Sequence, residues 1–119
     1  RRTIYRFSPR GAKRNLLDTF DCPDSSALAP QRASTTTPLQ SLTLMNNRFV
    51  LRMADFFAKR LEQEAGDDIA AQMRLAHELA LGRPVSNKEL TLATNFIANH
   101  GLVAYCRVLF NTNAFLYLR

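Results

Sequence analysis

The stretch NRFVLRMADFFAKRLEQE, residues 47–64, decides the fold, because it has the periodicity of an amphipathic helix. Its polar side chains recur at steps of three and four residues: Arg48, Arg52, Asp55, Lys59 and Glu62. The opposite side of the helix carries a broad apolar face: Phe49, Val50, Met53, Ala54, Phe56, Phe57 and Leu61. A face of this width must be covered by other helices. The stretch therefore predicts a helix within a helical domain.

Three further helices are predicted downstream, over residues 67–81, 87–99 and 102–110. The first begins with two aspartates, whose negative charge suits a helix N-terminus, and ends before a Gly-Arg-Pro stop. The second begins at a capping box formed by Ser86 and Glu89. The third is almost entirely apolar and therefore belongs to the interior.

Upstream, a helix is predicted over residues 37–46. Thr37 is its N-cap and Pro38 occupies the first helical position, where the missing N–H is not needed. Residues 14–20 contain enough apolar side chains for one or two helical turns. Between the two helices runs a long segment rich in proline, serine and threonine, which predicts a loop.

These patterns predict an all-α fold. Residues 37–119 form a compact bundle of about five helices, and residues 1–36 form an extended basic arm, a short helix and a long Pro/Ser/Thr loop within a larger domain. No apolar run approaches the roughly 18 residues needed to cross a bilayer, so no membrane span is expected. We expect the following side chains to build the core: Phe56, Phe57, Leu61, Leu75, Leu79, Phe96, Ile97, Tyr105, Leu109 and Phe110.

The basic charge is concentrated at the N-terminus. The formal net charge of +6 equals the basic residues among residues 1–14, which include no acidic residue, while the later charges cancel. A basic arm with interleaved Tyr5 and Phe7 could bind and stack on nucleic acid. The neutral body disfavours nucleic acid as a partner. We expect an extended segment instead, with both aromatic rings covered by the helical body or by a missing part of the parent domain.

Residue types that catalyse reactions or bind metals are few and widely separated. Cys22 and Cys106 lack a Cys-x-x-Cys pattern, which excludes zinc-ribbon, haem-attachment and thioredoxin-like motifs. Cys106 is expected to be buried, and a disulfide to Cys22 stays open. His77 is expected to be solvated, on the Arg74 side of its helix, and His100 to serve a helix end. We therefore expect no catalytic residue, metal site or cofactor in this segment.

One candidate functional loop remains. Asp18, Asp21 and Asp24 recur at three-residue steps, and oxygen ligands this close can bind a hard cation. The favoured alternative is that these short side chains cap helices or close Asx turns. We single out Asp21, Asp24, Arg32 and Asn46 as the possible functional residues of this part of the chain.

Five separated stretches share their order and residues with a known pattern: RRTIYRF (1–7), FDCPD (20–24), TTTPLQSLTLMNN (35–47), LGRPVSNKEL (81–90) and CRVLFNTNAFLYL (106–118). With them, the chain resembles the C-terminal part of the planctomycete-specific domain of unknown function. That domain occurs in large surface or secreted proteins of those bacteria, which often carry a cytochrome-c-like haem domain. Two departures are visible: Met45 replaces a usual leucine, and Ala114 replaces a usual glutamate.

The resemblance implies a location and a context. It implies an extracytoplasmic home, at the cell surface, in the periplasm or secreted, and a longer domain inside which Arg1 falls. It supplies no catalytic residue, and any haem would belong to another part of such a protein.

Three hypotheses for function follow. The leading one is a non-catalytic helical module that packs against or orients other domains of a large surface protein. The alternative is part of an extracytoplasmic enzyme or electron-transfer protein, whose site at Asp21, Asp24, Arg32 and Asn46 is completed by residues outside this segment. The third is nucleic-acid binding through the basic arm.

Overall fold

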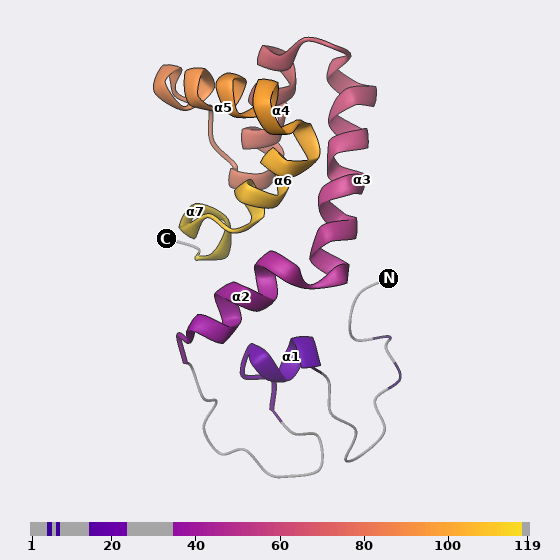
Figure 1. The fold of residues 1–119 in the computed structure, drawn as a ribbon, viewed down its shortest axis with the longest axis vertical. Helices are drawn as coiled ribbons and strands as arrows, with labels where there is room; N and C mark the ends of the chain where they lie inside the picture. The colour runs from indigo at the N-terminus through magenta and orange to yellow at the C-terminus, as the bar shows by residue number, and fades with distance from the viewer. Residues whose placement is uncertain (1–4, 6, 8–14, 24–34, 118–119) are drawn as a thin grey trace. The chain divides into compact units, whose positions relative to one another are not determined.

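A computed structural model describes residues 5, 7, 15–23 and 35–117 of the chain, and within these residues the fold is all-α without any strand, as predicted (Figure 1). The described helices are α1 (Asn15–Thr19), α2 (Pro38–Asn46), α3 (Arg48–Ala65), α4 (Ile69–Leu81), α5 (Asn87–His100), α6 (Leu102–Phe110) and α7 (Asn113–Leu116). None of them is long and apolar enough to cross a membrane, as far as the described residues go.

The predicted helix boundaries are confirmed to within two residues for α2 to α6. Side-chain caps at the starts of α3, α4 and α5 explain much of this accuracy, because each is a local hydrogen bond. The Asn47 side chain accepts from the N–H of Phe49 at 2.9 Å, and the Asp68 side chain caps α4 in the same way. The predicted capping box of α5 is present, with the Glu89 N–H donating to Ser86 Oγ and the Ser86 N–H donating to the Glu89 carboxylate.

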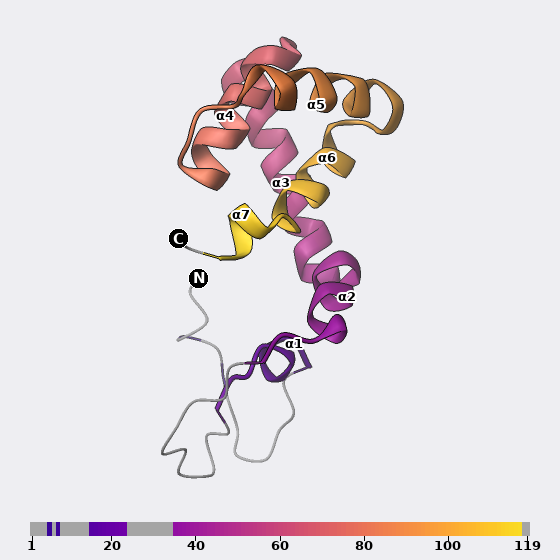
Figure 2. The ribbon, with the colours of Figure 1, turned by 90° about the vertical axis from the view of Figure 1, so that its left-hand side faces the viewer.

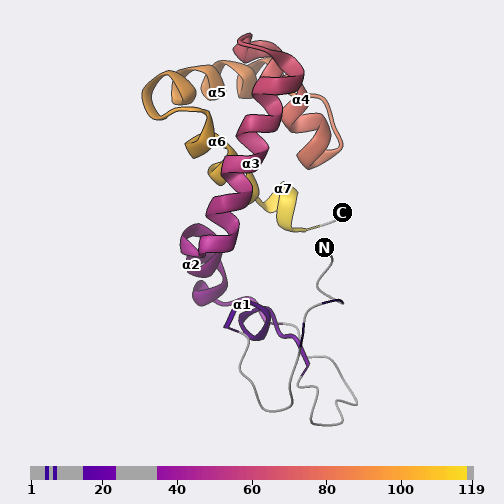
Figure 3. The ribbon, with the colours of Figure 1, turned by 90° about the vertical axis from the view of Figure 1, so that its right-hand side faces the viewer.

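The chain divides into two compact units, residues 1–43 and residues 44–119. In the second unit, α3 packs against α4 and α6, and α5 packs against α4 and α6, while the short α7 touches α4 and α6. Figures 2 and 3 show α5 at the level of the C-terminal end of α3, with α6 alongside α3.

Small side chains occupy the centre of this unit. Ala54 and Ala58 of α3 and Ala76 of α4 are buried, and they let the helices approach closely around Leu61 and Met73. Larger rings lie at the edge of this centre: Phe57 and Phe110 are half-buried, with ring centroids 5.4 Å apart. The predicted core is confirmed for Leu61, Tyr105 and Leu109, which are buried, and the following side chains pack against it while partly exposed: Phe57, Leu75, Phe96, Ile97 and Phe110.

Two predicted core residues are exposed. Phe56 is 53% exposed and Leu79 is 41% exposed, so their assignment to the core is wrong. Phe56 lies on the side of α3 that carries Arg52, whose guanidinium carbon is 6.0 Å from the ring centroid. The apolar face assigned to this helix was therefore too wide, because its buried side is limited to the face that meets α4 and α6.

A single residue connects α5 and α6. Gly101 ends α5 and begins α6, with φ 83° and ψ 164°, a backbone conformation that is essentially restricted to glycine. Its N–H donates to the carbonyl of Ile97 at 2.8 Å, and its carbonyl accepts from the N–H of Tyr105. Gly101 therefore supplies one backbone hydrogen bond to each of the two helix ends.

Candidate functional site

Two of the four residues predicted to be functional, Asp21 and Asn46, are described, and each has its own hydrogen-bond partner. The Asp21 carboxylate accepts from the Thr35 N–H at 2.6 Å and from the Thr35 hydroxyl at 2.9 Å, which ties the ends of the loop together. Asn46 accepts from Arg107 Nη2 at 3.4 Å. Asp24 and Arg32 lie outside the described residues. Among residues 5, 7, 15–23 and 35–117, no group of His, Cys, Asp and Glu side chains is placed to hold a metal ion.

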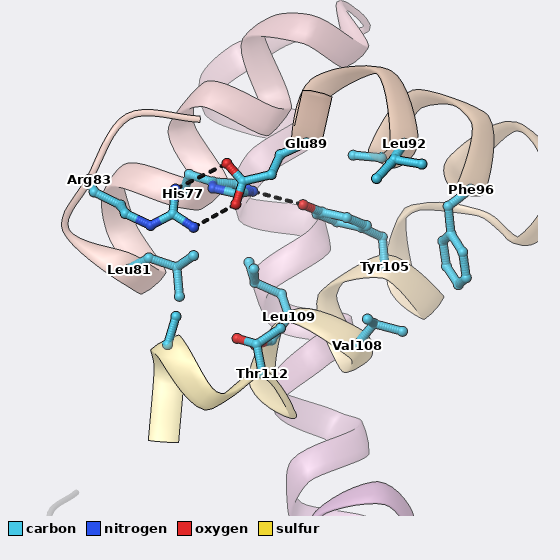
Figure 4. A pocket seen from close by; sticks show the side chains of 12 residues that line it. His77, Leu81, Arg83, Glu89, Leu92, Phe96, Tyr105, Val108, Leu109 and Thr112 are labelled. Atoms are coloured by element: carbon cyan, nitrogen blue, oxygen red, sulfur yellow. Dashed lines mark hydrogen bonds and ion pairs between the residues drawn. The ribbon is translucent and has the colours of Figure 1, made fainter. Parts of the chain in front are cut away.

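A pocket of about 570 Å³ lies between α4, α5 and α6 in the second unit. Figure 4 shows its arrangement: Arg83, Glu89, His77 and Tyr105 form a polar row, with Leu81, Leu109 and Val108 along the facing side. The remaining wall is largely apolar and is formed by these side chains: Leu92, Ala93, Phe96 and Ala114. The pocket is therefore an apolar hollow with one polar side.

A buried hydrogen bond joins His77 to Tyr105. Their Nε2 and hydroxyl oxygen atoms are 2.9 Å apart, and His77 is only 3% exposed. The prediction that His77 is solvated is wrong. His77 shares the inward face of α4 with Met73 and Ala76, whereas Arg74 points to solvent. The other ring nitrogen, His77 Nδ1, is buried with no hydrogen-bond partner among the described residues.

Burial keeps both members of this pair neutral. It lowers the pKa of His77 below the ordinary value of 6.5, which the Glu89 carboxylate offsets in part. It also raises the pKa of Tyr105 above the ordinary value of 10.0. At neutral pH the pair is therefore an imidazole and a phenol, with no charge on either ring.

Arg83 and Glu89 form an ion pair on the polar side of the pocket. Arg83 Nη2 lies 2.6 Å from Glu89 Oε1 and Nη1 lies 3.0 Å from Oε2, a two-point contact between a planar cation and a carboxylate. Glu89 also accepts from the N–H of Ser86 at 2.9 Å. The Arg83 hydrogen bonds, and then those of Ser86, hold the pKa of Glu89 well below its usual range.

These four side chains suit binding better than catalysis. A tyrosine with a raised pKa is a poor base or nucleophile at neutral pH, and the Glu89 carboxylate is already engaged by Arg83 and Ser86. Among the described residues, no side chain orients His77 through its Nδ1 atom, in contrast to a catalytic triad. The pocket can offer an apolar surface and the Tyr105 hydroxyl group to a ligand.

Sequence reasoning missed this site. Glu89 was found as a capping residue and His77 was placed on the wrong face, while Tyr105 was assigned only to the core. His77 and Tyr105 are 28 residues apart, so no local spacing links them. The one sequence feature that could have pointed to the pocket is Arg83, which lies six residues before the capping residue Glu89 and can pair with it.

The comparisons with known proteins identify the family. The sequence model of the PSD1 family, described as a protein of unknown function (DUF1553), matches residues 1–97. The chain belongs to the PSD1 family. This confirms the resemblance to a domain of unknown function. The searches of curated proteins and of solved structures found no match.

The PSD1 match includes three of the four polar pocket residues. His77, Arg83 and Glu89 lie within residues 1–97, whereas Tyr105 lies beyond them on α6. The pocket is thus formed by residues inside the matched span together with the helix that follows it.

Proposed function

We propose that this chain is a non-catalytic helical module, the C-terminal part of a planctomycete-specific PSD1 domain, which packs against other domains of a large surface or secreted protein and orients them. The observation that carries the proposal is the exposed aromatic side of α3. Phe49 and Phe56 are 57% and 53% exposed and lie seven residues apart, so both rings project from the same side of the helix.

Two exposed phenylalanines on one helix side indicate a partner surface. Full burial of a phenylalanine side chain contributes about 1.5–3 kcal/mol, so leaving two of them in water sacrifices stability that a partner can supply. Arg52 lies between them, with its guanidinium near the Phe56 ring. Aromatic residues and arginine are enriched in interface cores, so a neighbouring domain of the same protein is the partner that we expect on this side.

The enzyme alternative has weaker support. Asp21 is hydrogen-bonded to Thr35 within its own loop, and the two buried titratable rings, His77 and Tyr105, are paired and neutral. A neutral imidazole can accept a proton, but the group paired with His77 Nε2 is a phenol whose raised pKa keeps it protonated. Among the described residues the pocket therefore presents no activated nucleophile.

The third hypothesis is nucleic-acid binding through the basic N-terminal arm. Tyr5 and Phe7 are exposed within the part of the chain that the structure describes. In the proposed module another domain covers both rings. Titration of a labelled oligonucleotide at about 150 mM salt separates these interpretations, because weak phosphate contacts are largely lost under those conditions. Submicromolar, sequence-dependent binding that is lost on Tyr5→Ala would replace the proposal with nucleic-acid recognition.

Thiol labelling tests the packing of α3 directly. Phe56→Cys and Glu62→Cys are introduced separately into a Cys22→Ser background, both in the 119-residue chain and in the longer protein. Both positions are exposed on α3, but Glu62 lies on a different side of the helix from Phe49 and Phe56, so Glu62→Cys is the control. We expect maleimide to react much more slowly with Phe56→Cys in the longer protein than in the chain, and equally with Glu62→Cys in both. Equal rates for Phe56→Cys would contradict the proposal.

A further inference from the structure

We propose that the pocket between α4, α5 and α6 binds a neutral, mostly apolar small molecule that carries one hydrogen-bond-accepting oxygen. This ligand site is separate from the exposed side of α3 on which the proposed packing function rests, so either proposal can fail alone.

The size and walls of the pocket fit such a ligand. Its volume of about 570 Å³ falls within the roughly 300–1,000 Å³ of small-molecule sites. Leu81, Leu92 and Phe96 contribute apolar wall, and Leu92 is 70% exposed in the structure. A ligand with an apolar body would remove these surfaces from water, which is the main source of affinity in pockets of this kind.

The hydroxyl group of Tyr105 supplies the hydrogen bond. His77 Nδ1 is buried without a partner, and an unpaired lone pair is tolerated there better than an unpaired N–H. The imidazole proton is therefore assigned to Nε2, which donates to the Tyr105 oxygen 2.9 Å away. Within the described residues the Tyr105 O–H then has no acceptor of its own, and the oxygen atom of a ligand provides one.

Electrostatics select a neutral ligand. Arg83 and Glu89 satisfy each other through two short contacts on the polar side of the pocket, and their charges cancel. An anionic ligand would meet the Glu89 carboxylate and a cationic one would meet Arg83. Either charge would also lose its hydration against apolar walls, which is costly when no partner is free.

Three probes of almost the same shape test the inference: acetophenone, which carries a carbonyl oxygen, α-methylstyrene, in which CH₂ replaces that oxygen, and benzoate, which is charged. Each is titrated into the 119-residue chain while the backbone amide signals of Leu92 and Val108 are followed by NMR. We expect saturable binding of acetophenone, binding of α-methylstyrene weaker on the order of fivefold, and no saturable binding of benzoate.

Variants locate the binding site and its hydrogen bond. Tyr105→Phe keeps the ring and removes the hydroxyl, so it should bind acetophenone and α-methylstyrene equally. Val108→Trp fills the pocket and should abolish binding of both, whereas Val103→Trp is the matched control, since Val103 is exposed on α6 and does not line this pocket. The amide spectrum of each variant reports whether it is folded.

Several results would overturn the inference. These are the absence of saturable acetophenone binding, equal affinity for both neutral probes in the unmodified chain, or tighter binding of benzoate. The titration is repeated in the longer protein. Loss of acetophenone binding there would show that a segment of another domain fills the pocket, which would replace the small-molecule proposal while leaving the labelling test of α3 unaffected.

Discussion

His77 and Tyr105 show how burial changes the chemistry of two ordinary side chains. The imidazole is held 2.9 Å from the phenol and almost completely removed from water. Because burial lowers the pKa of His77, this imidazole is harder to protonate in the folded protein than in the unfolded chain. This difference makes stability depend on pH.

We predict that the free energy of unfolding falls as the pH drops below about 6.5, the ordinary pKa of histidine, and is independent of His77 above it. The unfolded state binds the proton first, so acid favours unfolding. Glu89, whose pKa is also lowered in the folded protein, adds a separate loss below its ordinary value of 4.5. Urea unfolding between pH 7.5 and 5 measures the His77 effect. In the His77→Gln variant, the free energy of unfolding should change less with pH in this range. An unchanged pH dependence would contradict its assignment to His77.

Cys106 is predicted to be chemically inert in the folded protein. Its side chain is completely buried, and burial raises its pKa to about 12, so the reactive thiolate is scarce at neutral pH. Ellman's reagent should therefore react with a Cys22→Ser variant only after denaturant is added. Rapid reaction under native conditions would show that α6 opens locally.

At the scale of helices, the cap of α5 serves both the helix and the pocket. Ser86 accepts from the N–H of Glu89, and Glu89 in turn accepts from Ser86 and from Arg83. We predict that Ser86→Ala lowers the free energy of unfolding by about 1 kcal/mol, as for other N-cap replacements. Thr91→Ala, an exposed change in the same helix, is the control and should be neutral or slightly stabilising. Equal losses in both variants would argue against a special role for the cap.

Helix boundaries were predictable from sequence because caps and stops are local signals. Helix orientation was predicted less well. The periodicity of α3 and α4 is visible in the sequence, but the sides that face other helices depend on contacts with residues far along the chain. Phe56 and Leu79 were therefore wrongly placed in the core, and His77 was wrongly placed in solvent.

At the scale of the whole unit of residues 44–119, stability should depend on the centre where alanines surround Leu61. Leu61 is fully buried, so Leu61→Ala is predicted to cost about 2–5 kcal/mol through lost burial and a cavity. Phe56→Ala should cost only about 1 kcal/mol or less, because its ring is half-exposed and contacts Arg52. Urea unfolding of both variants compares the two losses of stability. A larger loss for Phe56→Ala would show that Phe56, and not Leu61, belongs to the core.

Residues 44–119 are predicted to fold without residues 1–43, because the two parts form separate compact units. A fragment of residues 44–119 should give a helical circular dichroism spectrum and a cooperative urea transition. A fragment without such a transition would show that the first unit is needed for folding.

The pocket forms only when helices distant in the sequence pack together, which explains why the sequence did not reveal it. Its polar side combines His77 of α4, the Arg83 turn, Glu89 of α5 and Tyr105 of α6. Each residue alone has an ordinary local explanation, as a helical, turn, capping or core residue. Only the packing of three helices brings them together.

The connection through Gly101 has a consequence for how this family can vary. Because one glycine joins α5 to α6, an inserted residue would have no loop to occupy and would rotate or displace one helix against the other. Both helices carry pocket residues, so the same insertion would also move Tyr105 relative to Glu89. We expect relatives to tolerate extra residues between α3 and α4 more readily than between α5 and α6. In a library of single-residue insertions, the fraction of folded variants should be lowest for insertions at Gly101.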